Sequence, residues 1–453
     1  MSISVVAEVS AGADDIALQK IIQNNKLEGQ PLLKIPRIKI QSAMAQLGKR
    51  LFFSTLLGGK SDTACVSCHH PLLGGGDKLA LSIGVDAIDP ELIGPGRKHS
   101  PSGFNFDGGP TVPRNAQTTF NTVFYSRCMF WDCRIESLGA TPGMNGSDNS
   151  LMRTPDTMWG MPRVPASSLL QAQVAFPVTS EDEMRAKYME DDDNNKLRQA
   201  LAGRLIEEKE KWLKDFRLAF NSKASAEELI RFENISLAIA AYEASQIFVS
   251  NPWQKYIKGD HKALSQSAKK GALLFYRNKK QGGYNCAQCH TGDFFTDEAF
   301  HVVAIPQIGR GKEDGGSEDH DYGRFVLTGN PDDKFAFRTP SLLNVEVTDP
   351  YGHSGAYKDL RAVIRHMLNP ALALKTFDYQ LISLDSTIQK NNAKLNTEET
   401  LKHLKQLQSS GKSNVVNYEI DENHVNQLYD FLVSLTDPCV KNSDCLADWI
   451  EQD

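Results

Sequence analysis

The stretch that decides the fold occurs twice, as CVSCHH at residues 65–70 and as CAQCHT at residues 286–291. Each copy contains Cys-x-x-Cys-His and follows an amphipathic helical pattern, which ends in LGKRLFFS before the first and in KKGALLFYRN before the second. A single Cys-x-x-Cys is equally typical of a redox or zinc half-site. Two thiols at this spacing can both add to the vinyl groups of one haem, with the adjacent histidine beneath the iron. We therefore predict two covalently bound c-type haems, one held by Cys65, Cys68 and His69 and the other by Cys286, Cys289 and His290.

Amphipathic helical patterns dominate the rest of the chain, and sustained alternation typical of strands is scarce. The patterns lie at 41–53, 196–220, 225–249, 261–277, 397–410 and 422–435. Between them are segments rich in Gly, Pro, Ser and Asn, 71–116 and 139–168, that are too long to be simple connections. The predicted fold class is mainly α, with two cytochrome-c-like haem domains and long loops. Asn251-Pro252 interrupts the helical pattern, which places the domains at 1–250 and 251–453.

Composition limits the remaining possibilities. With a net charge of −6 over 453 residues, the chain offers no nucleic-acid surface. It lacks any stretch of 18 apolar residues, so we expect no membrane-spanning helix. Its first fifteen residues lack the basic start and apolar run of a secretory signal.

Four cysteines lie outside the two motifs, in close pairs. Cys128 with Cys133, and Cys439 with Cys445, are spaced for small-loop disulfides. Such bonds persist in oxidising surroundings such as a bacterial periplasm, whereas the alternative is four buried free thiols. We expect at least one disulfide and a periplasmic location.

Six motifs in order, between about residue 40 and residue 437, resemble the bacterial dihaem cytochrome c peroxidases and their MauG relatives. They are LGKRLFFS with CVSCHHP, VPRNAQTTFN, FWDCRIESL, QVAFPVTSEDEM, the second haem motif, and FRTPSLLNVEVTDPYGHSGAYKDLRAVIRHM. The resemblance implies an oxidoreductase that reduces hydrogen peroxide to water at a peroxidatic haem in the N-terminal domain. Electrons would come from a small cytochrome c or cupredoxin through an electron-transfer haem in the C-terminal domain. A homodimer is a further expectation by analogy.

The third and fourth motifs carry the residues that the resemblance assigns to catalysis. Trp131 matches a tryptophan between the haems, where an aromatic ring can pass electrons or holes; taken alone it reads as a core tryptophan. Gln173, Pro177 and Glu183 match catalytic residues at the open haem. Peroxide cleavage needs a proton moved from the inner to the outer oxygen, and a carboxylate over the iron can move it. Glu181 is the register-shifted alternative to Glu183.

Two further positions concern the sixth ligands of the irons. In the peroxidases a methionine lies fourteen residues after the histidine of a P-Y-x-H-x-G motif, which from His353 gives Met367. A thioether favours ferrous iron and raises the potential of the electron-transfer haem. His366 is the competing neighbour, and Met367 alone reads as helix core. MauG proteins have tyrosine here.

At the first haem the chain departs from many peroxidases. Their S-I-G-H sequence supplies a histidine that blocks the active haem until the partner haem is reduced, whereas this chain has Val85. Valine cannot ligate iron, so we expect a five-coordinate first haem that needs no reductive activation. His99 is the nearby alternative ligand.

The resemblance also implies a calcium ion between the haems. Asn115, Thr348 and Pro350 would supply neutral oxygens, which calcium accepts readily. Arg114 and Arg338 could bind haem propionates, since guanidinium binds carboxylates bidentately, although surface salt bridges are an equal alternative.

Two other functions remain open from the sequence. A MauG-like enzyme would use high-valent haems to oxidise a partner protein; Val85 favours it and Met367 opposes it. Tyr284, two residues before the second motif, would suit a hole-hopping relay to the surface or simply pack on haem. A non-enzymatic electron-transfer cytochrome would need a second ligand at the first haem, such as His99.

Overall fold

Helices and long loops make up the protein, as the fold-class prediction requires. The computed structural model describes residues 12–146, 151–158, 160, 166–316, 319–379, 388–389 and 392–451, so part of the loop expected at 139–168 lies outside it. The helices are α1 (Ala13–Asn24), α2 (Ala43–Phe53), α3 (Pro155–Met158), α4 (Leu169–Val174), α5 (Asn194–Glu207), α6 (Lys209–Ala219), α7 (Ala226–Leu229), α8 (Phe232–Ala244), α9 (Pro252–Ile257), α10 (Gln266–Tyr276), α11 (Phe325–Thr328), α12 (Leu360–Leu368), α13 (Pro370–Thr376), α14 (Ala393–Ser409), α15 (Glu422–Val433) and α16 (Ser443–Leu446).

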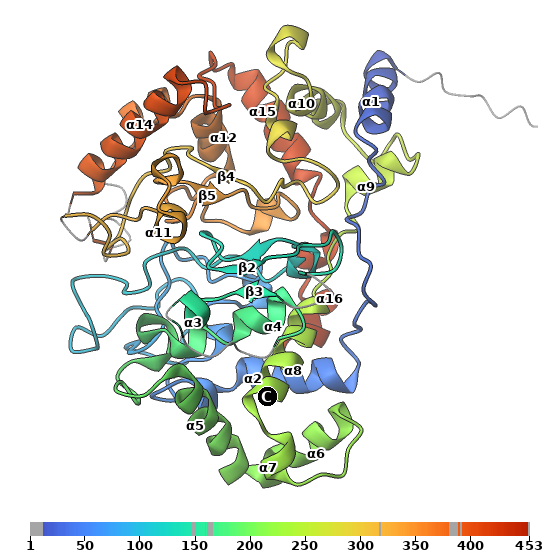
Figure 1. Cartoon of the computed structure of the whole chain (residues 1–453). Coiled ribbons are helices and arrows are strands. Elements are labelled where there is room, and N and C mark those ends of the chain that lie inside the picture. The colour runs from blue at the N-terminus through green and yellow to red at the C-terminus, as the bar shows by residue number, and fades with distance from the viewer. Residues whose placement is uncertain are drawn as a thin grey trace, which may run out of the picture.

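The strands are short and form two small antiparallel sheets. One sheet has the order β1 (Cys128–Met129), β2 (Ile135–Ser137) and β3 (Met152–Arg153). The other pairs β4 (Phe300–His301) with β5 (Phe337–Arg338). Both sheets lie between two groups of helices, with α2 and α4–α8 at one end of the molecule and α10, α12, α14 and α15 at the other (Figure 1).

The same helix crossing occurs in both groups. Gly48 of α2 lies against Ala238 and Tyr242 of α8, and Gly271 of α10 lies against Gln427 and Phe431 of α15. A Cβ at either glycine would overlap the backbone carbonyl of the facing helix. Each crossing comes just before a haem motif, since α2 and α10 are the amphipathic helices that precede Cys65 and Cys286. The repeat seen in the sequence is therefore also a repeat in space.

These crossings give a direct test of the fold. We expect Gly48→Ala to lower the free energy of unfolding by about 1–3 kcal/mol, because the added methyl overpacks the contact with α8. Gly203→Ala is the matched control: it changes a helical glycine of α5 whose Cβ would meet nothing within 4 Å. Alanine at position 203 is expected to raise the free energy of unfolding by up to about 1 kcal/mol. Denaturant unfolding measures both, and equal effects would contradict the crossing.

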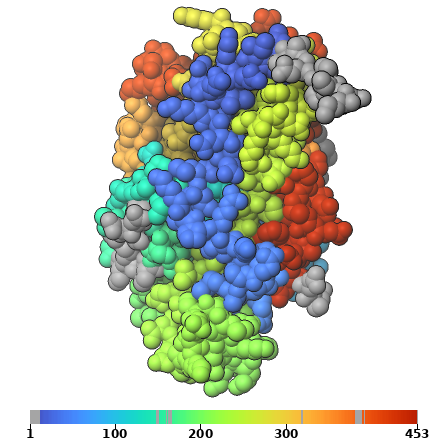
Figure 2. Space-filling model, turned by 90° about the vertical axis from the view of Figure 1, so that its right-hand side faces the viewer, coloured from blue at the N-terminus to red at the C-terminus, as the bar shows by residue number. Residues whose placement is uncertain are grey.

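Each end of the chain contacts the helix group formed by the opposite half of the sequence. Asp15 of α1 pairs with Lys269 of α10 at 2.8 Å and accepts a hydrogen bond from Tyr256, although α1 belongs to the N-terminal half. The chain then runs down one face of the molecule toward α2 (Figure 2). At the other end, the Trp449 carbonyl accepts a hydrogen bond from Tyr242 of α8. Each terminal segment therefore packs on the opposite half of the chain. The division into two domains at residue 250 stays a prediction.

The structure contains both disulfides that the cysteine spacing suggested. Cys128 of β1 is bonded to Cys133, and Cys439 is bonded to Cys445 of α16. The four free cysteines are those of the two motifs. Among the described residues, no helix combines the length and apolarity that crossing a bilayer requires.

Candidate haem-binding and peroxide site

One continuous cavity of about 740 Å³ lies between the two groups of helices. Both motifs line it, with Cys65, Cys68 and His69 from one half of the chain and Cys286, Cys289 and His290 from the other. Each motif begins a short 3₁₀ helix, Cys65–Ser67 or Cys286–Gln288, that follows the crossing helix of its half. The structure thus brings together the two sets of haem-attachment residues predicted from the sequence.

The two motif histidines have equivalent surroundings. The Nδ1–H of His69 donates to the carbonyl of Gly75 at 3.2 Å, and that of His290 to the carbonyl of Phe295 at 3.0 Å. Burial lowers the pKa of both imidazoles, which favours the neutral form. A neutral imidazole with Nδ1 fixed in this way has Nε2 available to ligate iron. Both sites therefore fit a haem iron.

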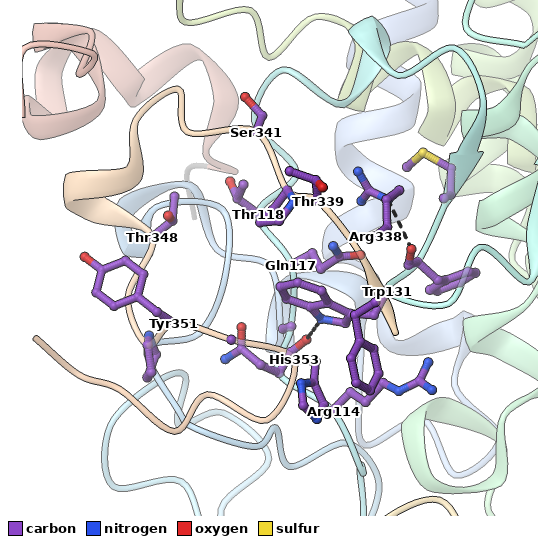
Figure 3. A pocket seen from close by; sticks show the side chains of 18 of the residues that line it. Arg114, Gln117, Thr118, Trp131, Arg338, Thr339, Ser341, Thr348, Tyr351 and His353 are labelled. Carbon is purple, nitrogen blue, oxygen red and sulfur yellow. Dashed lines mark hydrogen bonds between the residues drawn. The ribbon is translucent and has the colours of Figure 1, made fainter. Parts of the chain in front are cut away.

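Trp131 lies close to Gln117 and Arg338 in the cavity wall (Figure 3). Its Nε1–H donates to the carbonyl of Asn115 at 3.0 Å, and its own carbonyl accepts from the Arg338 amide at 2.8 Å. Two residues beyond each partner, the backbones of Gln117 and Pro340 contact His69 and His290 respectively. The indole lines the cavity and is held by these two hydrogen bonds, and its position between two haems stays a prediction.

Gln173, Pro177 and Glu183 all line the first-motif side of the cavity. Gln173 lies on α4, Pro177 begins the next short helix, and Glu183 lies in a π-helical turn, Glu181–Arg185. The Glu183 carboxylate is 3.7 Å from the guanidinium of Arg134 and acts electrostatically on both Cys68 and His69. Glu181 is exposed. Geometry therefore favours Glu183 over the register-shifted alternative.

The loop after the first motif is fixed against this turn. Gly84 packs directly on the backbone of Asp182 and Glu183, and Val85 beside it is completely buried. Arg97 holds the loop by donating to the carbonyls of Ile83, Gly84, Pro90 and Leu92.

His99 lies apart from the cavity wall. Its ring stacks on Phe106, with centroids 5.6 Å apart, and its Nδ1–H donates to the carbonyl of Ser100 at 2.9 Å. Among the described residues, the cavity lining includes neither His99 nor Val85. His99, the alternative ligand considered for the first haem, is therefore placed outside the described cavity lining.

At the second motif the structure distinguishes Met367 from its neighbour. Met367 on α12 lines the cavity, with 41% of its surface exposed. His366 is completely buried, accepts a hydrogen bond from the Tyr357 hydroxyl at 2.8 Å and donates to the carbonyl of Val303 at 2.8 Å. Burial lowers the pKa of His366 to about 4. Both nitrogens of His366 are thus occupied, and Met367 is the residue of the pair that faces the cavity.

Asn115, Thr348 and Pro350 also line the cavity, although they are far apart in the chain. The Asn115 amide NH₂ donates to the carbonyls of Leu79 and Ala80, so its side-chain oxygen is the atom left for a cation. An amide oxygen and backbone carbonyls are ligands that fit calcium.

Arg338 and Arg114, the two arginines considered as partners of haem propionates, differ in their hydrogen-bond partners. Arg338 lines the cavity at 2% exposure, and its buried Nη1 has no hydrogen-bond partner among the described residues. An orphaned buried donor fits a carboxylate that a cofactor would bring. Arg114 instead pairs with Asp321 through Nε and Nη2 and with Asp132 through Nη1. These ion pairs hold the pKa of Asp132 well below its usual range.

Glu243 and His301 are among the ionisable groups of the cavity wall that sequence reasoning missed. Glu243, on α8, is 6% exposed and lines the cavity beside Cys65. Its signal was a single acidic residue within the apolar run AIAAYEASQIF. His301 is hydrogen-bonded to Asp297 at 2.8 Å, which raises the pKa of its imidazole to about 10.

Comparison with known proteins finds similarity to one family. Residues 42–262 match the family model described as di-haem cytochrome c peroxidase. The chain is 28% identical to the cytochrome c551 peroxidase of Pseudomonas aeruginosa over 77% of this chain and 76% of that one. It is 24% identical to the methylamine utilization protein MauG of Methylorubrum extorquens over 71% and 67% of the two chains.

Two solved structures have a fold similar to that of this chain. A MauG-like protein associated with microbial copper homeostasis aligns with a TM-score of 0.58 at 21% identity, covering 92% of this chain and 96% of that one. The diheme peroxidase BthA of Burkholderia thailandensis aligns with a TM-score of 0.51 at 19% identity, covering 87% and 86%. The chain is thus similar to the di-haem cytochrome c peroxidases and MauG proteins in both sequence and fold. It is an oxidoreductase of the cytochrome c peroxidase type, and its similarity to di-haem peroxidases implies two haems.

Proposed function

We propose that this protein is a periplasmic dihaem c-type peroxidase that reduces hydrogen peroxide to water with electrons from a small cytochrome c or cupredoxin. The observation that carries the proposal is the single cavity that contains both haem motifs, Trp131, and the Gln173, Pro177 and Glu183 set. The two disulfides suit an oxidising compartment. Attachment of both haems through thioethers, the calcium ion at Asn115, Thr348 and Pro350, and a homodimer belong to the same proposal.

In this mechanism the chain supplies acid–base chemistry, orientation and an electron path. Haem, when bound, would supply an iron centre capable of peroxide and electron-transfer chemistry, held by His69 at the first motif and by His290 at the second. Glu183 takes the proton from the inner peroxide oxygen and returns it to the outer oxygen, which leaves as water. Gln173 hydrogen-bonds the peroxide, and Pro177 keeps the turn before Glu183 rigid. Trp131 couples the two haems, and Met367 raises the potential of the second.

The function is tested by mixing the purified protein with hydrogen peroxide and a reduced small cytochrome c. Two molecules of donor should be oxidised for each peroxide consumed, because the reduction to water takes two electrons. Peroxide consumption without matching donor oxidation would reject this function.

A second candidate function, oxidation of a partner protein as in MauG, is favoured by one observation. The hydroxyl of Tyr284 is 2.9 Å from Nδ1 of His424, and its ring meets Tyr418 edge-on at 4.9 Å. Tyr284 and Tyr418 line the cavity beside Cys286. A phenol with an adjacent base can lose an electron and transfer its proton to that base, which suits a relay between the second haem and the surface.

Tyr284→Phe separates the two functions. If the relay operates, peroxide added without donor yields a tyrosyl EPR signal and oxidised tyrosine by mass spectrometry in the wild type, and both are lost in Tyr284→Phe. Tyr429→Phe, which changes a half-buried tyrosine outside the described cavity lining, is the control. Unchanged signals in Tyr284→Phe would exclude this relay.

A further inference from the structure

The repeated helix crossing allows the two haem surroundings to be compared position by position. Relative to the contact glycines, Ala238 and Tyr242 of α8 correspond to Gln427 and Phe431 of α15. The next residue in each case faces the cavity, and it is Glu243 in the first half but Leu432 in the second. The residues one turn earlier, Ile239 and Leu428, also both line the cavity, which confirms the correspondence.

The carboxyl group of Glu243 is buried without a partner. At 6% exposure, it forms no hydrogen bond or ion pair with any of the described residues. Its charge adds to the burial that raises the pKa of the Cys65 thiol to about 12, so it lies close to the first haem-attachment residue. Burying an unpaired carboxylate is costly, and the group relieves that cost by holding a proton. Burial accordingly raises the pKa of Glu243 to about 8.

The elements packed against α8 leave Glu243 without a compensating charge. The titratable groups that reach it are Cys65 and, on its own helix, Tyr242. Helix α4 and the Thr122–Phe124 turn contain no ionisable residue. The charged side chains of α2 have other partners, because Lys49 binds the carbonyls of Asp448 and Ile450 and Arg50 pairs with Asp215. In α5, Arg198 pairs with Asp156, and Arg204 binds the carbonyls of Gly58 and Gly59. The other two charged residues of α5, Lys196 and Glu207, are exposed.

From this asymmetry we propose that Glu243 is the proton-holding residue of the first haem and couples its reduction to proton uptake. When one electron enters that haem, the positive charge near Glu243 falls by one unit, and the carboxylate takes up one proton from water. When the electron leaves, Glu243 releases the proton. The second haem, with Leu432 at the equivalent position, has no such coupling. The inference rests on the proposed function only in that it requires haem at both motifs.

The coupling fits the chemistry that the first haem would perform. Reduction of peroxide to water consumes two protons with two electrons, so a group that is protonated as electrons arrive keeps the net charge of the buried site constant. A haem that only relays electrons needs no proton, which is consistent with leucine at the matching place.

The test is a spectroelectrochemical titration of both haems from mildly acidic to mildly alkaline pH. In the wild type, the first-haem potential should fall as pH rises, with a slope approaching about 59 mV per pH unit, the value for a tenfold change with one electron. Glu243→Gln should remove most of that slope. Glu243→Leu, which copies the second half, should do the same, and the second-haem potential should respond to pH equally in all three proteins.

An infrared difference spectrum between reduced and oxidised protein gives an independent readout. A protonated carboxyl band should appear on reduction of the first haem in the wild type and be missing in Glu243→Gln. A wild-type slope retained in both variants, or a first-haem potential independent of pH in the wild type, would overturn the proposal. Neither readout uses peroxide, so the coupling can fail while peroxidase turnover succeeds, and the reverse.

Discussion

Glu183→Gln is expected to slow peroxide turnover by about 10²–10⁴-fold, the usual contribution of a positioned acid–base group. Glutamine keeps the shape and hydrogen-bonding reach of the side chain but cannot carry the proton between the peroxide oxygens. Haem spectra and potentials should be nearly unchanged. Stopped-flow absorption after mixing with peroxide measures the effect on the cleavage step itself.

Glu181→Gln is the control for this substitution. Glu181 lies in the same π-helical turn, but it is exposed. Its replacement should leave turnover near the wild-type rate. If Glu183→Gln were as active as Glu181→Gln, the assignment of the proton-transfer group would be wrong.

Replacing both cysteines of the first motif, Cys65→Ser with Cys68→Ser, is expected to abolish peroxide turnover completely. Both thiols line the cavity on the Glu183 side, and without them the first haem has no covalent attachment. Haem staining after denaturing electrophoresis, with a pyridine haemochrome count, should show one haem per chain instead of two.

The matching change at the second motif, Cys286→Ser with Cys289→Ser, provides the contrast. It should also leave one covalent haem per chain, and this protein should still react with peroxide but fail to oxidise a donor continuously. Two covalent haems in either variant would contradict the attachment that we propose.

Sequence reasoning succeeded where the information is local. The amphipathic patterns before the two motifs became α2 and α10. The cysteine spacing predicted at least one disulfide, and both of the suggested pairs, Cys128 with Cys133 and Cys439 with Cys445, are bonded. A continuous apolar pattern predicted a single helix in two places where the structure has two helices in succession. The pattern at 196–220 forms α5 and α6, which meet at Glu208, and the pattern at 225–249 forms the short α7 and then α8.

The rest depended on contacts between distant segments. No local pattern shows that Arg114 pairs with Asp321, 207 residues away, and so is engaged in ion pairs within the protein. His366 and Met367 are adjacent in sequence, and only the partners of His366, Tyr357 and Val303, show which of the two faces the cavity. Glu243 went unnoticed for the same reason, since its meaning lies in the comparison of α8 with α15.

The central claim is that the first haem is open to peroxide in the resting enzyme. Its most direct test is the EPR spectrum of the fully oxidised protein, followed by peroxide addition without prior reduction. Buried Val85, together with His99 lying outside the described cavity lining, predicts a high-spin, five-coordinate signal that changes rapidly with peroxide. Two low-spin haems that do not react with peroxide would contradict the account.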